Sequence, residues 1–169
     1  VVLGESHLGY LSLNDEIMRR DCHGRPEGSL VMTRDSHLRP KTAFEFLDKI
    51  KSLNPSSMID ISDGFFQDAN HIAEQSGVSL AIDLKSLPIS SSFTGGMSLL
   101  ELLSFGEDYQ LLFTSSAKDV EFQGLKRIGE VRNRGKSSLL LSTDAEDFRP
   151  YEELAFELGY KGKLGYQHL

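Results

Sequence analysis

Two aspartates, Asp60 and Asp63, stand three residues apart at the end of a short apolar stretch and could act together on one ligand. Residues 57–61 alternate apolar side chains with small or charged ones, which is typical of a short buried strand. Gly64 follows, and glycine permits a tight turn in which the backbone approaches a ligand closely. A pair of carboxylates between such a strand and the start of a helix would suit Mg²⁺ held together with phosphate oxygens.

The same residues have a plainer interpretation. Ser62 or Asp63 could cap the helix that begins after Gly64, because short polar side chains accept hydrogen bonds from the first amides of a helix. Asp60 would then be an ordinary solvated acid. The residue types alone leave both interpretations open.

Four segments follow one another in an order that resembles the C-terminal domain of thiamine-monophosphate kinase, a family of the superfamily that includes aminoimidazole ribonucleotide synthetase. They are Ser-Met-Ile-Asp-Ile-Ser-Asp-Gly from Ser57, Ser-Gly-Val from Ser76, Leu-Pro-Ile-Ser from Leu87 and Gly-Glu-Asp-Tyr-Gln-Leu-Leu-Phe-Thr from Gly106. The resemblance runs from about His37 to the end of the chain, and the last of these segments is the one specific to that kinase.

The resemblance implies an α/β domain with a mixed β-sheet flanked by helices, and the alternation of predicted strands and helices agrees with it. Residues 37–169 would form this C-terminal domain, with residues 1–36 as a connecting helix and loop of the same domain. The chain begins with Val, so we expect an N-terminal ATP-binding domain to be absent from it. In the family ATP lies between the two domains and dimers form through the missing one, so we expect this fragment to be an inactive monomer.

Carried over residue by residue, the resemblance implies that Asp60 and Asp63 bind Mg²⁺ and that Ser62 contacts ATP. Glu107 would contact the thiamine portion of the substrate, and Tyr166 would stack on a heteroaromatic ring. The implied reaction is the ATP-dependent phosphorylation of thiamine monophosphate to thiamine diphosphate. Direct in-line transfer of this kind needs no nucleophilic side chain, because the substrate phosphate attacks.

Some residues depart from the family pattern. Phe105 stands where the family has Gly, and Gln110 replaces an expected acid, as Gln167 does in the tail. Two alternatives therefore stay open: another ATP-dependent synthetase of the same superfamily, or a non-catalytic regulatory or partner module with this fold. In the plainer interpretation Glu107 is a solvated loop acid, and Tyr166 belongs to a disordered chain end.

Composition narrows the class of protein. The 169 residues are 39% hydrophobic and 25% charged, which suffices for one soluble domain with a core. No apolar run is long enough to span a bilayer, no secretory leader is visible, and a lone Cys22 fits a reducing cytoplasm. The net charge of −7 and pI near 5.2 argue against nucleic acid as a partner, whereas Mg²⁺ could still bridge the acids to a phosphate.

Periodicity predicts the elements that position these residues. Helices are expected from Pro40 to Asn54 and over residues 65–77, 97–104 and 151–158, and strands over residues 78–84, 109–114, 125–131 and 138–141. We expect Phe44, Leu47 and Leu158 to face the core and Asp83 to face solvent. We expect the strand at 138–141 to be an edge hairpin partner.

Overall fold

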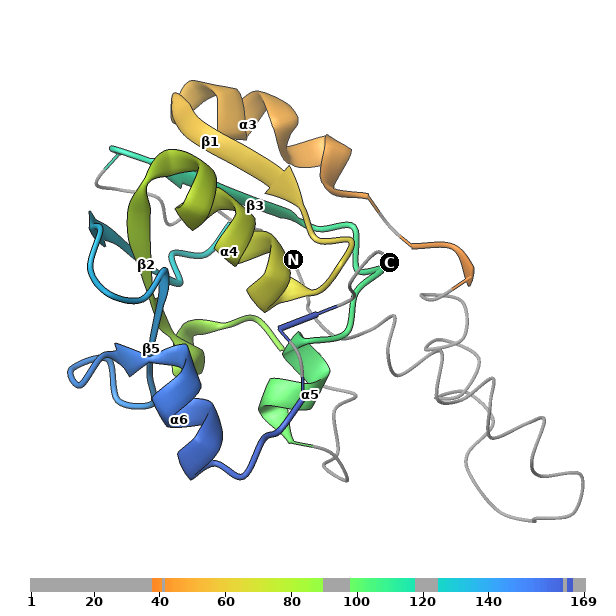
Figure 1. Ribbon diagram of the computed structural model, residues 1–169. Coiled ribbons are helices and arrows are strands. Elements are labelled where there is room, and N and C mark those ends of the chain that lie inside the picture. The colour runs from red at the N-terminus through yellow and green to blue at the C-terminus, as the bar shows by residue number, and fades with distance from the viewer. Residues whose placement is uncertain (1–37, 41, 90–97, 118–124, 163, 166–169) are drawn as a thin grey trace, which may run out of the picture.

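The computed structural model of the chain describes residues 38–40, 42–89, 98–117, 125–162 and 164–165. The connecting helix and loop expected at residues 1–36, and Tyr166, lie outside the described residues. The described chain combines helices with strands (Figure 1): they alternate as far as β3, and three more strands and a helix follow, which agrees with the predicted α/β class. Within this part of the chain no helix is both long and apolar enough to cross a membrane.

The described strands form two sheets. In the smaller sheet β1 (Pro55–Asp60) pairs with β3 (Leu111–Ser115) in antiparallel orientation. The larger sheet has the order β4-β2-β5-β6, made of β4 (Gly129–Asn133), β2 (Val78–Asp83), β5 (Leu139–Ser142) and β6 (Arg149–Pro150). It is mixed, as predicted, because β2 runs antiparallel to β4 and parallel to β5.

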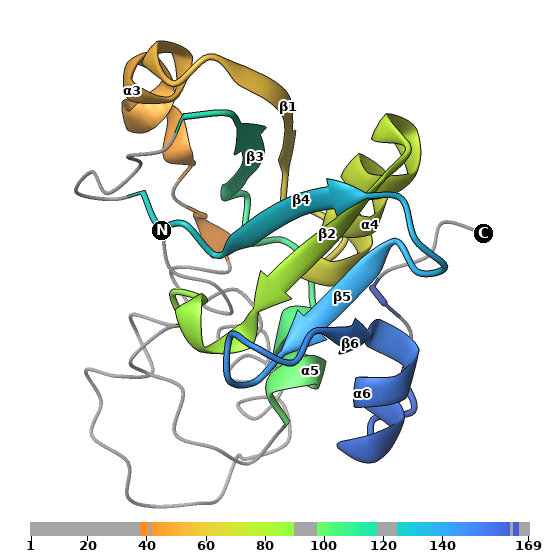
Figure 2. The ribbon, with the colours of Figure 1, turned by 90° about the vertical axis from the view of Figure 1, so that its left-hand side faces the viewer.

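The prediction that residues 138–141 are an edge hairpin partner is wrong. β5 lies between β2, to which it is parallel, and β6, to which it is antiparallel (Figure 2). Leu139 and Leu141 are 1% and 0% exposed. The unbroken apolar run in this strand is therefore that of an inner strand, which is covered on both faces.

The helix α4 (Phe65–Ser76) joins the two sheets, since it packs against β1, β2 and β5 (Figures 1 and 2). Its apolar face is buried as predicted, and the Phe66 ring meets the rings of Phe65 and Tyr151 edge-on, with centroids 5.5 and 5.1 Å away. The helix ends at Gly77, whose φ of 64° is a left-handed conformation that glycine adopts without steric cost.

The segment after Pro40 begins its helix later than predicted. A 3₁₀ turn, η1 (Ala43–Phe46), precedes α3 (Leu47–Ser52). Phe44 is 70% exposed, so its assignment to the core is wrong, whereas Leu47 is half-buried. The buried positions of this segment are Ala43, Ile50 and Leu53. This segment has more apolar side chains than its short helix can direct toward the core.

The remaining helices are η2 (Leu84–Ser86), α5 (Leu99–Leu103) and α6 (Tyr151–Glu157). Leu158, expected to face inward, follows the end of α6 and is 49% exposed. Asp83, expected to face solvent, is half-buried and accepts a hydrogen bond from the Lys85 amide at 3.0 Å. Its carboxylate therefore caps η2.

Candidate functional site

One loop follows β1 and another precedes β3, the two paired strands of the smaller sheet. The aspartate loop, residues 61–64, leads from β1 into α4, and the partner loop, residues 105–110, leads from α5 into β3. Because β1 and β3 are antiparallel and Asp60 pairs with Leu111, the two loops begin side by side. The fold thus brings together the two segments that the sequence analysis singled out for chemistry.

Backbone hydrogen bonds join the two loops directly. The Ile61 amide donates to the Gln110 carbonyl oxygen at 2.8 Å, and the Tyr109 amide donates to the Ile61 carbonyl oxygen at 2.8 Å. The Glu107 amide donates to the Ser62 carbonyl oxygen at 2.9 Å. The ladder of β1 and β3 therefore continues beyond the strands and fixes the backbone of Glu107 beside that of Ser62.

Three glycines permit the close packing of this region. A Cβ atom on Gly106 would stand 1.9 Å from the Ser62 carbonyl oxygen, and one on Gly64 would stand 2.7 Å from the Ser104 carbonyl oxygen. A Cβ atom on Gly165, in the C-terminal tail, would stand 2.3 Å from the Asp63 carbonyl oxygen. The backbones of the aspartate loop, the partner loop and the tail thus meet at distances that only glycine allows.

The partner loop is strained at two positions. Glu107 has a φ of 67° and Tyr109 a φ of 50°, both in the left-handed region that L-residues rarely adopt. Such conformations cost of order 1 kcal/mol or more each and concentrate at functional sites. The strain supports a role for this loop beyond connecting α5 to β3.

The plainer interpretation placed Ser62 or Asp63 at the N-cap of α4, but the structure places Gly64 at that position. The cap residue is Gly64, which has no side chain, and the carboxylate of Asp68 reaches back from inside the helix. Its Oδ2 accepts hydrogen bonds from the amides of Ser62 at 3.0 Å and Asp63 at 3.1 Å. Burial raises the pKa of Asp68, whereas these two amide bonds lower it.

The predicted site residues occupy different depths. Asp60 ends β1 on the same face as Met58 and is exposed, as is Glu107, whereas Ser62 and Asp63 are half-buried. Tyr166 lies outside the described residues. The structure brings Ser62, Asp63 and Glu107 together through their backbones and places Asp60 at the strand end next to them.

The sequence analysis missed Asp68 as part of this arrangement. An acidic residue in the first turns of a helix usually faces solvent and complements the helix dipole. The one available signal was its spacing, five and six residues after Asp63 and Ser62, which lets an α4 side chain reach back over the aspartate loop.

The two loops and the residues beside them carry acidic side chains and no cationic ones. Residues 60–68 and 104–110 include Asp60, Asp63, Asp68, Glu107 and Asp108 but no Lys or Arg. No group of three or more His, Cys, Asp or Glu side chains in the described part of the chain is arranged to hold a metal ion. Mg²⁺ is usually bound by one or two carboxylates, with water and substrate phosphates completing its shell, so an aspartate pair fits that ion.

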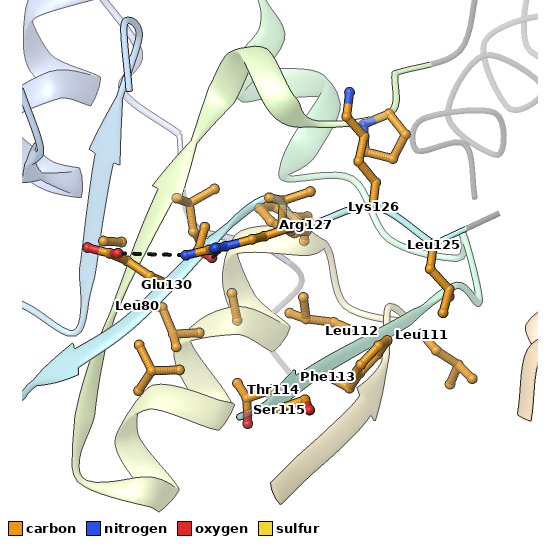
Figure 3. A pocket seen from close by; sticks show the side chains of 18 of the residues that line it. Leu80, Leu111, Leu112, Phe113, Thr114, Ser115, Leu125, Lys126, Arg127 and Glu130 are labelled. Atoms are coloured by element: carbon orange, nitrogen blue, oxygen red, sulfur yellow. Dashed lines mark hydrogen bonds and ion pairs between the residues drawn. The ribbon is translucent and has the colours of Figure 1, made fainter. Parts of the chain in front are cut away.

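A cavity of about 390 Å³ lies between β3 and β4 and is lined mainly by apolar side chains. Figure 3 shows Leu112 and Phe113 from β3 on one side and Leu80 from β2 on another. Ile61 also lines it, but the predicted site residues of the two loops do not. The cavity therefore does not include the carboxylates of Asp60, Asp63 or Glu107.

Comparisons with known proteins identify relatives of the chain. No protein-family model matches it. Thiamine-monophosphate kinase of Leptospira interrogans is 30% identical over 159 residues, which are 92% of this chain and 49% of that protein. Thiamine-monophosphate kinase of Aquifex aeolicus is 43% identical over 118 residues, 66% of this chain and 36% of that protein. The chain thus spans about half, or less, of the length of these curated relatives.

Solved structures give the same result. A structure described as AaThiL complexed with AMPPCP and TMP has a TM-score of 0.71 and 30% identity, covering 89% of this chain and 47% of that one. Thiamine monophosphate kinase from Aquifex aeolicus has a TM-score of 0.69 and 31% identity, covering 88% of this chain and 49% of that one. The matched region is the C-terminal part of these proteins, and the fold is of the aminoimidazole ribonucleotide synthetase-like type.

Proposed function

We propose that the chain, which is related to the C-terminal part of thiamine-monophosphate kinases, forms the C-terminal part of such an enzyme. The whole enzyme would phosphorylate thiamine monophosphate with ATP. The observation that carries the proposal is the hydrogen bond between Glu107 and Ser62, at 2.9 Å. It joins the two sequence segments on which the resemblance rests. The solved relative described with AMPPCP, an ATP analogue, and TMP supports the same pair of substrates.

On the nucleotide side, Asp60 and Asp63 would hold Mg²⁺ and Ser62 would contact ATP. The bound cation would neutralise charge on the phosphates during transfer. The rigid exit of β1 supports these roles, since the Ile61 amide and carbonyl are both hydrogen-bonded to the partner loop. Correct alignment of donor and acceptor is most of what a phosphoryl-transfer site has to provide.

On the acceptor side, Glu107 and Tyr166 would bind thiamine monophosphate. The exposed carboxylate of Glu107 can accept hydrogen bonds from an aminopyrimidine, and an aromatic ring such as that of Tyr166 can stack on a heteroaromatic one. Gly165, which precedes Tyr166, lies against the Asp63 carbonyl oxygen. That contact supports a place for the tail beside the aspartate loop.

The reaction itself requires little from side chains. A phosphate oxygen of thiamine monophosphate attacks the γ-phosphorus of ATP, the bond from that phosphorus to the β,γ-bridging oxygen breaks, and ADP leaves. We propose that the remainder of the ATP site, and a dimer contact, come from an N-terminal half of a longer polypeptide. The 169 residues alone would then be inactive.

The test is a kinase assay on the full-length protein that carries this chain. Incubation with ATP, Mg²⁺ and thiamine monophosphate should give thiamine diphosphate and ADP in equal amounts, resolved by chromatography. Unphosphorylated thiamine is the matched control, since it lacks the attacking phosphate. Turnover of ATP with a different acceptor but not with thiamine monophosphate would contradict the proposal, as would failure to bind Mg²⁺ and an ATP analogue.

A further inference from the structure

Asp68 is a carboxylate in the interior of the protein, with an exposed fraction of 2%. Placing a carboxylate in such surroundings is costly unless hydrogen bonds compensate it. Here the compensation comes from the amides of Ser62 and Asp63, which both donate to the same oxygen, Oδ2, at 3.0 and 3.1 Å. Asp68 is thus tied to the two residues on which the proposed nucleotide side of the site depends.

The backbone of the aspartate loop is held from both sides. Asp68 takes the amides of Ser62 and Asp63, and the Glu107 amide donates to the Ser62 carbonyl oxygen at 2.9 Å. The Asp63 carbonyl oxygen lies against Gly165. Both groups of the Ser62 backbone and the Asp63 amide therefore have hydrogen-bond partners, and the Ser62 and Asp63 side chains project from a constrained backbone.

The Asp68 contacts also determine how this loop can treat an anion. Free amides at the start of a helix are a ready phosphate site. The amides of Ser62 and Asp63 already donate to Asp68, and the negative charge of that carboxylate would repel a phosphate beside them. At these two positions a phosphate could then be bound directly by the Ser62 hydroxyl, and by the Asp63 carboxylate only through a cation.

We propose that Asp68 is the positioning residue of the aspartate loop. It orients Ser62 and Asp63 for a cation-bridged phosphate and withholds their amides from direct phosphate binding. The effect of Asp68 on cation binding rests on the proposed function, whereas its hydrogen bonds to the Ser62 and Asp63 amides do not. Two experiments therefore test the hydrogen bonds and the effect on activity separately.

The first experiment measures amide hydrogen exchange in the full-length protein by NMR. In Asp68→Ala the amides of Ser62 and Asp63 should exchange at least tenfold faster than in wild type. The Ile61 and Tyr109 amides, which bond to backbone carbonyls, should keep their protection. Glu101→Ala, which removes an exposed acid from the first turn of α5, is the matched control and should change none of these rates.

The second experiment measures the Mg²⁺ concentration that gives half-maximal phosphorylation of thiamine monophosphate. Asp68→Ala should raise this Mg²⁺ concentration at least tenfold and change KM for thiamine monophosphate by no more than about twofold. Asp68→Asn should raise the Mg²⁺ concentration less, because its side-chain amide oxygen can still accept the two hydrogen bonds. A structural role alone would lower the melting temperature without changing the Mg²⁺ requirement.

The outcomes separate the two proposals. Unchanged exchange at Ser62 and Asp63, or faster exchange with an unchanged Mg²⁺ requirement in a working enzyme, would overturn the role of Asp68. If Asp68→Ala does not fold, Asp68→Asn is measured in its place and should show the same changes at smaller size. If the wild-type protein has no kinase activity, the proposed function fails. The role of Asp68 is then tested by the NMR chemical shifts of the Ser62 and Asp63 amides. Adding Mg²⁺ with an ATP analogue should change these shifts less in Asp68→Asn than in wild type.

Discussion

Gly106 lies against Ser62 so closely that a Cβ atom on it would stand 1.9 Å from the Ser62 carbonyl oxygen. The amide of the next residue, Glu107, donates to that same oxygen. Two motifs far apart in the sequence are therefore in contact through backbone atoms, and the absence of a side chain at Gly106 is what permits the contact.

Gly106→Ala should destabilise the protein by about 1–3 kcal/mol, because the new methyl group would meet backbone that cannot move aside without breaking hydrogen bonds. Urea unfolding of the wild type and the variant measures this difference. Gly135→Ala is the matched control, since its Cβ would meet only the Ser79 hydroxyl oxygen at 3.9 Å and should change stability by no more than about 0.5 kcal/mol. Equal stability of the two variants would contradict the close approach.

Elements with a clear period were predictable from sequence. The stripe of α4 and the glycine that ends it gave the helix to within a residue. The core assignment of Phe44 failed because periodicity says which side chains share a face but not whether another element covers that face. The pairing of β5 with β2 likewise depends on contacts between distant segments, which no local pattern encodes.

The candidate site was predictable only in part. The motifs around Asp63 and Glu107 stood out in the sequence, but their contact follows from the antiparallel pairing of β1 and β3. Asp68 could not be recognised as a buried residue, because its burial depends on where the Ser62 and Asp63 amides lie. Long-range backbone geometry, and not residue type, determines this part of the site.

The core assignment is tested by two phenylalanines. Phe66→Ala should destabilise the protein by about 3–5 kcal/mol, since Phe66 is 0% exposed and its loss leaves a cavity beside Tyr151. Phe44→Ala removes the same ring from a side chain that is 70% exposed and should cost no more than about 0.5 kcal/mol. A large loss at Phe44 would show that its ring is covered, and would contradict the observed exposure.

Stability at low pH should depend on Asp144. The Asp147 and Glu146 amides and the Ser142 hydroxyl donate to its Oδ1 at 2.9, 2.9 and 2.8 Å, and these bonds lower the pKa of Asp144 from 3.8 to about 2. A carboxyl group with a lowered folded pKa adds stability above its unfolded pKa, and this stability is lost as pH falls through the folded pKa.

Asp144→Asn keeps the acceptor oxygen but not the charge. It should therefore melt below the wild type at pH 7, and the difference should shrink as the pH falls from about 4 to about 2. Melting temperatures recorded across this range provide the test. A gap between the two proteins that stays constant down to pH 2 would show that the charge of Asp144 is not involved.

The place of the tail is tested at Gly165. In Gly165→Ala the new methyl group would lie 2.3 Å from the Asp63 carbonyl oxygen and 2.7 Å from the Gln67 Cβ, so the tail should move away from α4. KM for thiamine monophosphate should rise about tenfold, equivalent to ~1.4 kcal/mol of binding, with a smaller effect on KM for ATP. In the control Gly135→Ala the added methyl would have only the Ser79 hydroxyl oxygen within 4 Å, at 3.9 Å, and both KM values should stay unchanged. A higher KM for ATP alone would place the tail at the nucleotide instead.

The most direct test of the proposed metal site is the rate of thiamine diphosphate formation by full-length Asp63→Ala at saturating Mg²⁺. Loss of a ligand that neutralises the transferred phosphoryl group should lower kcat by about a hundredfold or more, or ~2.7 kcal/mol of barrier. Asp48→Ala, which removes a carboxylate with 99% of its side chain exposed, should leave the rate unchanged. If Asp63→Ala lowers kcat by only a few-fold, Asp63 does not hold the cation, and the role of the aspartate loop proposed here is contradicted.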